Sequence, residues 1–522
     1  MAKSINSSFD ESHVIDTYPV IVVGAGLGGL GAACQLALVR KKVLLLEKHN
    51  VPGGFATSFV RGRFEFEGAL HELDGIGTPE NKGSLYDFFE KLGVLPDKLE
   101  LKQVPEFYRS VFLDGYDETI PFGLEAYTEK FIELFPHEKQ GIEEFMEVCK
   151  AVRAGIDYIR GKQGKYTQQE ILKEHPWLAR VPALTLLELF NRFFKDKRLI
   201  AVIGQLWGYV GVPPSRVNAF IYIAMIMSYL KYGAAFPAGR SHALTTSLVK
   251  AVEELGGTVR LNALVNRILV DDGKVCGVEL LNGDIYRCKV VISNVNPICT
   301  AMKMLPEDVV PESYMKSIYA PEIGPSAISV YLGLNATPKE LGLNAHETFI
   351  NEDDDLNNAF SSFHKLEPPK YMVAACYNHI YEEISPPGTT QLVLTSLQMG
   401  KLWQNVAPDQ YFSIKDKMGD KMVDIVEKTI SPNIRDYIEV AEVATPLTYY
   451  RYSKNIEGAI YGYTQDILNG PNFRLKSRGA IPGLYQVGAW TNFGGGYSTT
   501  LLSGRLAAGM LLDDIKKGTV SI

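Results

Sequence analysis

Short, fully apolar runs that end at a glycine or an acid mark the N-terminal part of the chain. Residues 20–23 read Val-Ile-Val-Val and stop at Gly24, and residues 42–46 carry a second run that stops at Glu47. Runs of this length without polar alternation are typical of strands buried on both faces of a parallel sheet. The apolar stretch between them, from about Leu27, predicts a helix. The order strand, turn, helix, strand is that of a nucleotide-binding unit.

The glycines between the first strand and the helix have the spacing of a dinucleotide-binding turn. Gly24 permits the tight turn, Gly26 lets the backbone approach a pyrophosphate, and Gly29 lets the helix pack close to the strand. The free N–H groups at the start of the helix would face the phosphates. Glu47 follows about 20 residues later, where an acid binds the ribose hydroxyls and disfavours a 2′-phosphate.

This fingerprint alone does not separate NAD from FAD, and two further glycine-rich segments favour FAD. Gly53 and Gly54 follow the acid and predict a second close approach of the backbone, although Pro-Gly-Gly is also an ordinary turn. Near the C-terminus, residues 483–496 end in a glycine triplet and lead into an apolar helix expected from about Ser498. Such a segment is expected to bring the chain back to the cofactor.

The pattern changes repeatedly along the middle of the chain. Residues 81–235 look largely helical, with aromatic-rich apolar stretches. Residues 301–440 are mixed, with strand-like runs at 327–332 and 391–397. The segment between them, residues 236–300, combines a helix-like stretch at 247–255 with β-rich runs at 258–261, 265–270, 275–281 and 290–293, separated by hairpin-type turns.

These patterns predict an α/β fold with a discontinuous, Rossmann-like FAD-binding domain and an inserted mixed α+β substrate domain. A chain of 522 residues is long enough for two domains. The expected division is a flexible tail at residues 1–17, an FAD-binding domain at 18–80, 236–300 and 441–522, and a substrate-binding domain at 81–235 and 301–440.

Composition narrows the function classes. A formal net charge of -7 and a pI of about 5.8 argue against non-specific nucleic-acid binding. Six scattered cysteines without a CxxC pair predict neither a zinc site nor a disulfide framework, which fits the cytoplasm. The polar first 17 residues lack the apolar core of a signal peptide. Residues 219–230 are too short to span a bilayer, so they predict a buried helix, a channel-lining helix or a helix touching a membrane surface.

Four segments resemble the FAD-dependent carotenoid and retinoid oxidoreductases, which comprise phytoene desaturases, carotene cis-trans isomerases and retinol saturases. They are residues 18–71, 236–294, 455–462 and 488–508, and the third looks most like the saturase and isomerase branch. The resemblance implies that FAD is the cofactor. It also implies the cofactor-binding residues, which are Gly24, Ala25, Gly26, Gly28, Gly29, Glu47, Lys48, Gly53, Gly54, Phe55, Ala56, Val265, Asn294, Gly488, Ala489, Gly495, Gly496 and Tyr497.

One position departs from the pattern of these enzymes. Their C-terminal motif carries an acid that would bind the ribityl chain of the flavin, and Ala489 stands at that position. Asn492 or Thr491 could replace the lost contact. The helix expected after the glycine triplet could aim its N-terminus at the flavin and stabilise negative charge on the reduced ring.

The candidate catalytic residues are His71, Tyr461 and Glu457, each with a structural alternative. His71 lies in a Gly-x-x-His pattern that resembles the saturases, and it is either an acid or base or a hydrogen-bonded structural histidine. Glu67 could orient it or could be a solvated strand residue. Tyr461 would face the flavin or the substrate, or simply pack in the core. Glu457 would donate a proton or cap a turn.

The expected function is oxidoreduction or isomerisation of carbon–carbon double bonds in a long apolar substrate, with an isoprenoid polyene as the first candidate, by hydride transfer at flavin N5. Partners would be the polyene or lipid, an external electron donor or acceptor, and a membrane surface contacted peripherally, with no nucleic acid. Alternatives are a fatty-acid double-bond isomerase, an amine-oxidase-like flavoenzyme, or a non-catalytic lipid-binding protein of this fold. No esterase elbow, no HExxH motif and no metal-ligand spacing is present.

Overall fold

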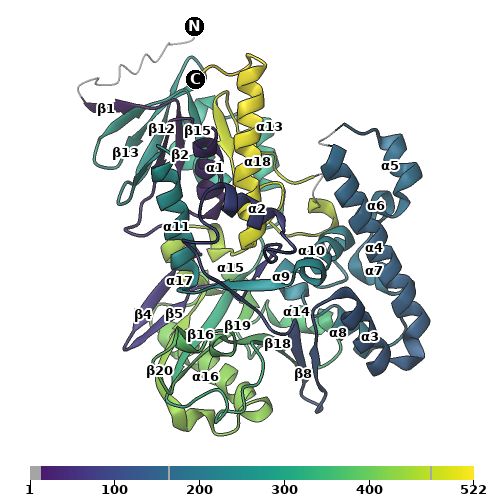
Figure 1. Ribbon diagram of the computed structural model, residues 1–522. Coiled ribbons are helices and arrows are strands. Elements are labelled where there is room, and N and C mark those ends of the chain that lie inside the picture. Colours follow the sequence, from purple (N-terminus) through teal and green to yellow (C-terminus); the bar gives the residue numbers. More distant parts are fainter. Residues whose placement is uncertain (1–12, 163–164, 471–472) are drawn as a thin grey trace.

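Five parallel strands form the sheet at one end of the molecule (Figure 1). The computed structural model describes residues 13–162, 165–470 and 473–522. From β2 the chain adds strands on one side of the sheet, and β15 then lies on the other side of β2. In sheets of this kind, ligands bind at the carboxyl ends of the strands beside the point where the direction changes. The order across the sheet is β11 (Thr258–Arg260), β3 (Val43–Leu46), β2 (Val20–Val23), β15 (Val290–Ser293) and β21 (Leu484–Gln486).

Both faces of the parallel sheet are covered, which explains its unbroken apolar strands. Val20 and Val22 face the cluster built by the helices, and Ile21 and Val23 face the cluster built by a four-stranded sheet. The helices are α1 (Leu27–Leu38), α11 (Arg240–Glu254) and α18 (Tyr497–Lys516), and the small sheet is β1 (Val14–Thr17), β14 (Ile285–Arg287), β13 (Lys274–Leu280) and β12 (Val265–Asp271).

A seven-stranded sheet forms the other end of the molecule (Figure 1). Helix α16 (Tyr411–Thr429) covers one of its faces with Met418, Met422 and Val423, which pack against β16 residues such as Val330. The strand order is β20 (Ile438–Ala444), β16 (Ser326–Leu334), β19 (Thr390–Gln398), β18 (Tyr371–Cys376), β17 (Glu347–Asn351), β8 (Tyr108–Phe112) and β9 (Asp117–Ile120).

Most of the helices between α2 and α10 lie together at one side of the molecule (Figure 1). They bury an aromatic-rich cluster of their own, which includes Phe145, Phe190 and Tyr222. The helices are α2 (Ser84–Lys91), α3 (Leu124–Leu134), α4 (Lys139–Lys162), α5 (Gln168–Glu174), α6 (Pro176–Arg180), α7 (Leu186–Phe190), α8 (Lys197–Ile203), α9 (Trp207–Val210) and α10 (Ala219–Tyr232).

Short elements connect these parts. The hairpin β4 (Ser58–Arg61) and β5 (Phe64–Glu67) lies near the edge of the seven-stranded sheet, and β10 pairs with both β6 and β7. The bounds of the remaining elements are β6 (Leu73–Asp74), β7 (Leu101–Gln103), β10 (Ala234–Pro237), α12 (Pro297–Cys299), α13 (Glu312–Tyr319), α14 (Leu356–Ser362), α15 (Gly400–Gln404) and α17 (Pro446–Ser453).

The structure confirms the predicted α/β fold class and most of the predicted elements, and it corrects three boundaries. Residues 14–17 are not a loose tail, because β1 pairs in parallel with β14; residues 1–12 lie outside the described part. Residues 81–235 are largely helical, as predicted, with the short strands β7, β8 and β9 among the helices. The expected boundaries after residues 235 and 440 fall inside β10 and β20. The division into two domains stays a prediction.

Helix α10 fits two of the three alternatives for residues 219–230, the buried helix and the channel-lining helix. One stripe, including Tyr222, Ile223 and Ile226, is buried in the helical core. Another, including Phe220, Ala224 and Met225, lines the cavity described below. Within the described residues, no helix combines the length and apolar character that crossing a membrane requires.

Candidate functional site

A cavity of about 810 Å³ runs from the carboxyl edge of the parallel sheet into the helical region. Small-molecule sites in proteins measure about 300–1,000 Å³. The lining comes from the turn after β2, from residues 46–49 and 53–56, from the segment after β15, and from residues 488–500. Farther in, the lining comes from α10 and from strands of the seven-stranded sheet. The cavity therefore joins the predicted cofactor segments to the predicted substrate region.

The glycine-rich turn after β2 leads into the first backbone N–H groups of α1, which have no partner among the described residues. Gly24 has a φ of +94°, which favours glycine, and Gly26 caps α1 without a side chain. Because the first N–H groups of a helix lack partners within it, they can bind an anion. Gly53, with a φ of +115°, donates from its N–H to the carbonyl of Ala25 at 2.8 Å and so holds the second glycine turn beside the first.

Three chain segments meet so closely here that a larger residue would not fit. A Cβ on Gly28 would lie 2.5 Å from Oδ1 of Asn294 and 2.9 Å from the backbone nitrogen of Gly488. A Cβ on Gly29 would lie 1.9 Å from the carbonyl oxygen of Gly24. The predicted roles of these glycines in close approach therefore match the geometry. Asn294 comes from the end of β15, directly beside β2.

Glu47 is buried at the end of β3 and faces the turn. Its Oε2 accepts from the N–H of Ala25 at 2.7 Å, and its Oε1 accepts from the N–H of His49 at 2.9 Å. Each carboxylate oxygen has a second lone pair, so the side chain can still accept from two ribose hydroxyls. The next residue, Lys48, also lines the cavity and donates to the carbonyl of Tyr452 at 2.8 Å; burial lowers the pKa of its ammonium.

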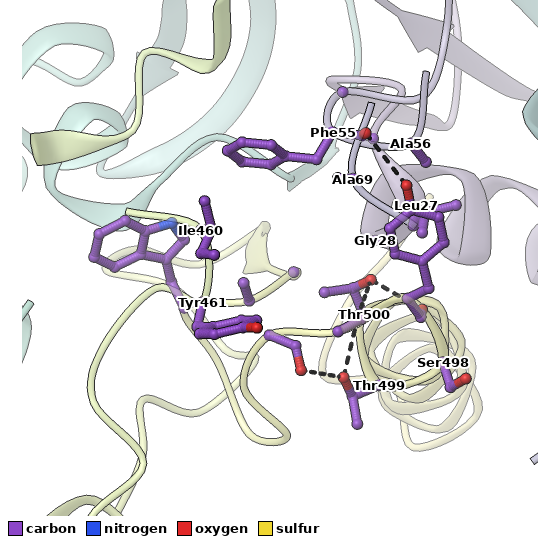
Figure 2. Close-up of a pocket in the computed structure, with 18 of the residues that line it drawn as sticks. Leu27, Gly28, Phe55, Ala56, Ala69, Ile460, Tyr461, Ser498, Thr499 and Thr500 are labelled. Carbon is purple, nitrogen blue, oxygen red and sulfur yellow. Dashed lines mark hydrogen bonds between the residues drawn. The ribbon is translucent and has the colours of Figure 1, made fainter. Parts of the chain in front are cut away.

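The C-terminal glycine triplet and the start of α18 close the other side of this region. Figure 2 shows Leu27 and Gly28 of α1 and Thr499 and Thr500 of α18 around the same space as Phe55 and Tyr461. Tyr461 packs on the triplet, because a Cβ on Gly495 would lie 2.6 Å from its Cα. The remaining predicted cofactor residues Phe55, Ala56, Val265, Gly488, Ala489, Gly496 and Tyr497 line the cavity as well, whereas Ala25 and Gly29 support the turn from behind.

The departure at Ala489 is accompanied by a buried arginine that the sequence interpretation missed. Arg474 is 2% exposed and donates to the carbonyls of Ala489 at 2.9 Å and Thr491 at 2.8 Å. Burial lowers the pKa of its guanidinium to about 10. Thr491 is not a replacement for the missing acid, since its hydroxyl is used by Gly488 and Ser503. Asn492 lines the cavity and remains a candidate.

His71 lines the cavity where the cofactor segments give way to the seven-stranded sheet. Its Nδ1 lies 2.6 Å from Oε1 of Glu347 and 3.3 Å from the hydroxyl of Tyr209. The sequence interpretation missed Glu347 and Tyr209, which lie 276 and 138 residues away from His71 in the chain. The one local signal was a pair of titratable residues, His346 and Glu347, at the start of an apolar strand.

The structure places the other candidate acids elsewhere. Glu457 is not among the lining residues; it has a φ of +58°, and its backbone packs against Gly400. Both alternatives for Glu67 are wrong, because it is fully buried and accepts from the N–H and hydroxyl of Ser241 at 2.8 and 2.7 Å. It thereby binds the N-terminus of α11 instead of His71.

Tyr461 lines the cavity and also packs against the helical core, and burial raises the pKa of its phenol, so it is neutral at physiological pH. Glu72, which the sequence interpretation also missed, lines the cavity next to His71. Both of its carboxyl oxygens are buried without a hydrogen-bond partner among the described residues. Burial, followed by the negative charge of Glu347, holds the pKa of Glu72 well above its usual range.

Comparison with known proteins agrees with this geometry. The model of the family described as flavin containing amine oxidoreductase matches residues 27–512. The chain is 26% identical to all-trans-retinol 13,14-reductase of Danio rerio, over 93% of this chain and 84% of that protein. It is 27% identical to chloroplastic prolycopene isomerase of Daucus carota, over 95% of this chain and 80% of that protein. A crystal structure of an oxidoreductase from Methanosarcina mazei superimposes with a TM-score of 0.62 at 16% identity, over 94% of this chain and 99% of that one.

The residues at the sheet edge fit FAD. The uncapped start of α1 suits a pyrophosphate, the buried carboxylate of Glu47 suits ribose hydroxyls, and a Cβ at Gly28 would fill the cradle between the segments. The family match runs from the start of α1 through the C-terminal glycine triplet into α18, and it includes the insert between them. The chain therefore belongs to the flavin containing amine oxidoreductase family and is an FAD-dependent oxidoreductase.

Proposed function

We propose that the protein reduces, desaturates or isomerises a carbon–carbon double bond in a long polyene isoprenoid. The observation that carries this proposal is the continuation of the FAD-binding region into an apolar cavity. One stripe of α10, including Phe220, Ile221 and Met225, lines that cavity, and Val393 and Leu397 line it from β19. The retinol reductase and the prolycopene isomerase named above support a substrate of this class.

In this reaction the protein itself has to donate or accept one proton. Bound FAD supplies a two-electron hydride donor or acceptor. When a double bond is reduced, one carbon takes the hydride and the neighbouring carbon takes a proton, and desaturation removes the same pair. His71 is the group we assign to that proton, because it lines the cavity and holds a carboxylate at Nδ1. Reduction consumes two electrons from an external donor, and desaturation passes two to an external acceptor.

The first test is the anaerobic absorption spectrum of the FAD-loaded protein with all-trans-retinol and with prolycopene. Bleaching of the oxidised flavin bands on addition of a polyene identifies a desaturase. Reoxidation of the chemically reduced flavin by a polyene identifies a saturase. A changed isomer on chromatography, without a net change in the reduced flavin bands, identifies an isomerase. If neither polyene reacts in either flavin state while putrescine bleaches the flavin, the polyene assignment is wrong and amine oxidation replaces it.

Glu47 gives an expected result that concerns FAD alone. The two carboxylate oxygens of Glu47 accept from two backbone N–H groups and would also accept from the ribose hydroxyls. Glu47→Gln keeps only one acceptor oxygen, so one of these buried donors would face the NH₂ group of the amide. Losing a charged acceptor costs about 1.5–3 kcal/mol, which corresponds to roughly a 10- to 100-fold weaker FAD affinity. Fluorescence titration of the apoprotein with FAD measures it. Glu65→Gln, a partly exposed acid outside the cavity, is the control and should leave the affinity unchanged.

A contact with a membrane surface belongs to the same proposal, because an insoluble polyene has to be taken up from a bilayer. Co-sedimentation of the FAD-loaded protein with vesicles of neutral phospholipid, with and without prolycopene dissolved in them, measures this contact. Binding that is absent in both cases would remove the membrane from the proposal without affecting the chemistry.

A further inference from the structure

Four residues from three separate segments form a polar cluster at the wall of the cavity. His71 precedes β6, Tyr209 lies in α9, and Glu347 begins β17. Oε1 of Glu347 accepts from Nδ1 of His71 at 2.6 Å and also from the hydroxyl of Tyr209. The Glu347 side chain is 1% exposed, so this ion pair is shielded from solvent. Glu72 completes the cluster next to His71 in the chain.

The contact between His71 and Glu347 determines which ring nitrogen carries the proton. A carboxylate only accepts hydrogen bonds, so Nδ1 of His71 must be the donor. In the neutral imidazole the lone pair is then on Nε2. Nε2 has no partner among the described residues and is not among their buried unpartnered atoms, while the side chain is 11% exposed and lines the cavity. Nε2 is therefore the nitrogen that is open to the cavity.

The charges around His71 favour a single added proton at that position. Two close, buried carboxyl groups do not both ionise readily, and the raised pKa of Glu72 keeps that group neutral. Glu347 accepts from two donors, His71 and Tyr209, which is the arrangement that suits a carboxylate. Protonation of His71 then gives a neutral pair instead of an isolated buried cation. A buried imidazolium without such a partner would be costly.

The other titratable groups that face the cluster are buried or are paired with groups outside it. His346 donates from Nε2 to the carbonyl of His71 at 3.0 Å, and burial lowers the pKa of its imidazole. Burial raises the pKa values of the Tyr209 and Tyr229 phenols and of the Asp74 carboxyl. Glu106 accepts from the backbone N–H of His346 and forms an ion pair with His379.

We propose that Glu347 is a positioning residue for His71. It fixes the imidazole in the tautomer with the proton on Nδ1, turns Nε2 toward the cavity, and stabilises the imidazolium that forms when His71 takes up a proton. Neutral Glu72 keeps the net charge of the protonated cluster at zero. This inference rests on the proposed proton-transfer role of His71, which it deepens by naming the group that prepares His71 for it.

The test observes the ring nitrogens of His71 in the FAD-loaded protein labelled with ¹⁵N-histidine. The His71→Gln spectrum identifies its signals among those of the nine histidines. In the wild type we expect a protonated Nδ1. In Glu347→Gln we expect this preference to be lost and both tautomers to appear, because the glutamine amide can present either its oxygen or its NH₂. With a polyene that reacts, kcat should fall roughly 100-fold at unchanged KM.

Glu106→Gln is the matched control, because it also changes a glutamate that pairs with a histidine but lies away from the cavity. It should leave the His71 signals as they are. The inference is overturned if Nδ1 is unprotonated in the wild type, or if Glu347→Gln leaves the spectrum unchanged. The wild-type measurement stands even if Glu347→Gln does not fold. If neither polyene reacts but the signals behave as expected, the positioning role holds and the proposed substrate is what fails.

Discussion

Gly504→Ala is expected to cost the protein its FAD, although the substitution lies on a helix behind the site. Gly504 is in α18, where the helix crosses the start of α1. A Cβ at this position would lie 2.0 Å from the carbonyl oxygen of Gly28 and 2.6 Å from the backbone nitrogen of Ala32. Both are backbone atoms, so no side chain can rotate away, and the two helices must separate. Overpacking of this kind costs up to about 3 kcal/mol.

The loss should reach the cofactor because Gly28 belongs to the first turn of α1, which lines the cavity at the sheet edge. Moving that turn disturbs the N–H groups that we assign to the pyrophosphate. The measurement is the flavin-to-protein absorbance ratio after gel filtration, together with the thermal unfolding midpoint with and without added FAD. Both should fall in Gly504→Ala.

The same helix offers its own control. Gly509→Ala makes an identical change five positions later, where an added Cβ meets nothing within 4 Å. Replacing a helical glycine by alanine in open space stabilises by about 1 kcal/mol. Gly509→Ala should therefore raise the unfolding midpoint slightly and retain FAD. Equal behaviour of the two variants would contradict the close crossing of α1 and α18.

The sequence predicted the cofactor half of the site well, because the determinants there are local. Residues 20–23 are apolar at every position because β2 is covered on both faces, and the glycines follow directly after them. Glu47 is likewise placed by the strand that it ends. A pattern of this kind is visible within about 30 residues and does not depend on the rest of the chain.

The substrate half could not be predicted in the same way, because its contacts join distant segments. Glu347 reaches His71 only because β17 pairs with β8 and β18 inside the seven-stranded sheet, and no local pattern encodes that order. Glu67 shows a related limit. Glu67 alternates with Phe64 and Phe66 along β5, which indicated that it faces solvent. Helix α11 covers this face, however, and the N-terminus of α11 donates to the Glu67 carboxylate.

At Ala489 the missing acid has to be considered together with Arg474, which contacts the same loop. Taken alone, the missing acid left flavin binding in question. The structure places the Arg474 guanidinium against the carbonyls of the same loop, so a buried cation at the cavity holds the loop. The sequence separation of 15 residues and the intervening turns made this contact invisible in the pattern.

His71→Gln is expected to remove most of the turnover while FAD stays bound. The imidazole at the cavity wall is the group that we assign to the proton, and glutamine cannot exchange one near neutral pH. A positioned acid or base contributes roughly 10²- to 10⁴-fold, so kcat should fall by that factor, which corresponds to an activation free energy that is higher by about 2.7–5.5 kcal/mol. Its bonds to Glu347 and Tyr209 are at the wall of the cavity and involve none of the cofactor-binding residues named above, so the flavin spectrum should be unchanged.

The measurement is anaerobic stopped-flow absorption of the flavin with the polyene that the wild type converts. His379→Gln is the control, since His379 also pairs with a glutamate but does not line the cavity, and its rate should match that of the wild type. A His71→Gln protein that still converts the polyene at the wild-type rate would assign the proton to another group. Glu72 would then be the next residue to replace, because it is neutral, unpartnered and adjacent to His71 at the same wall.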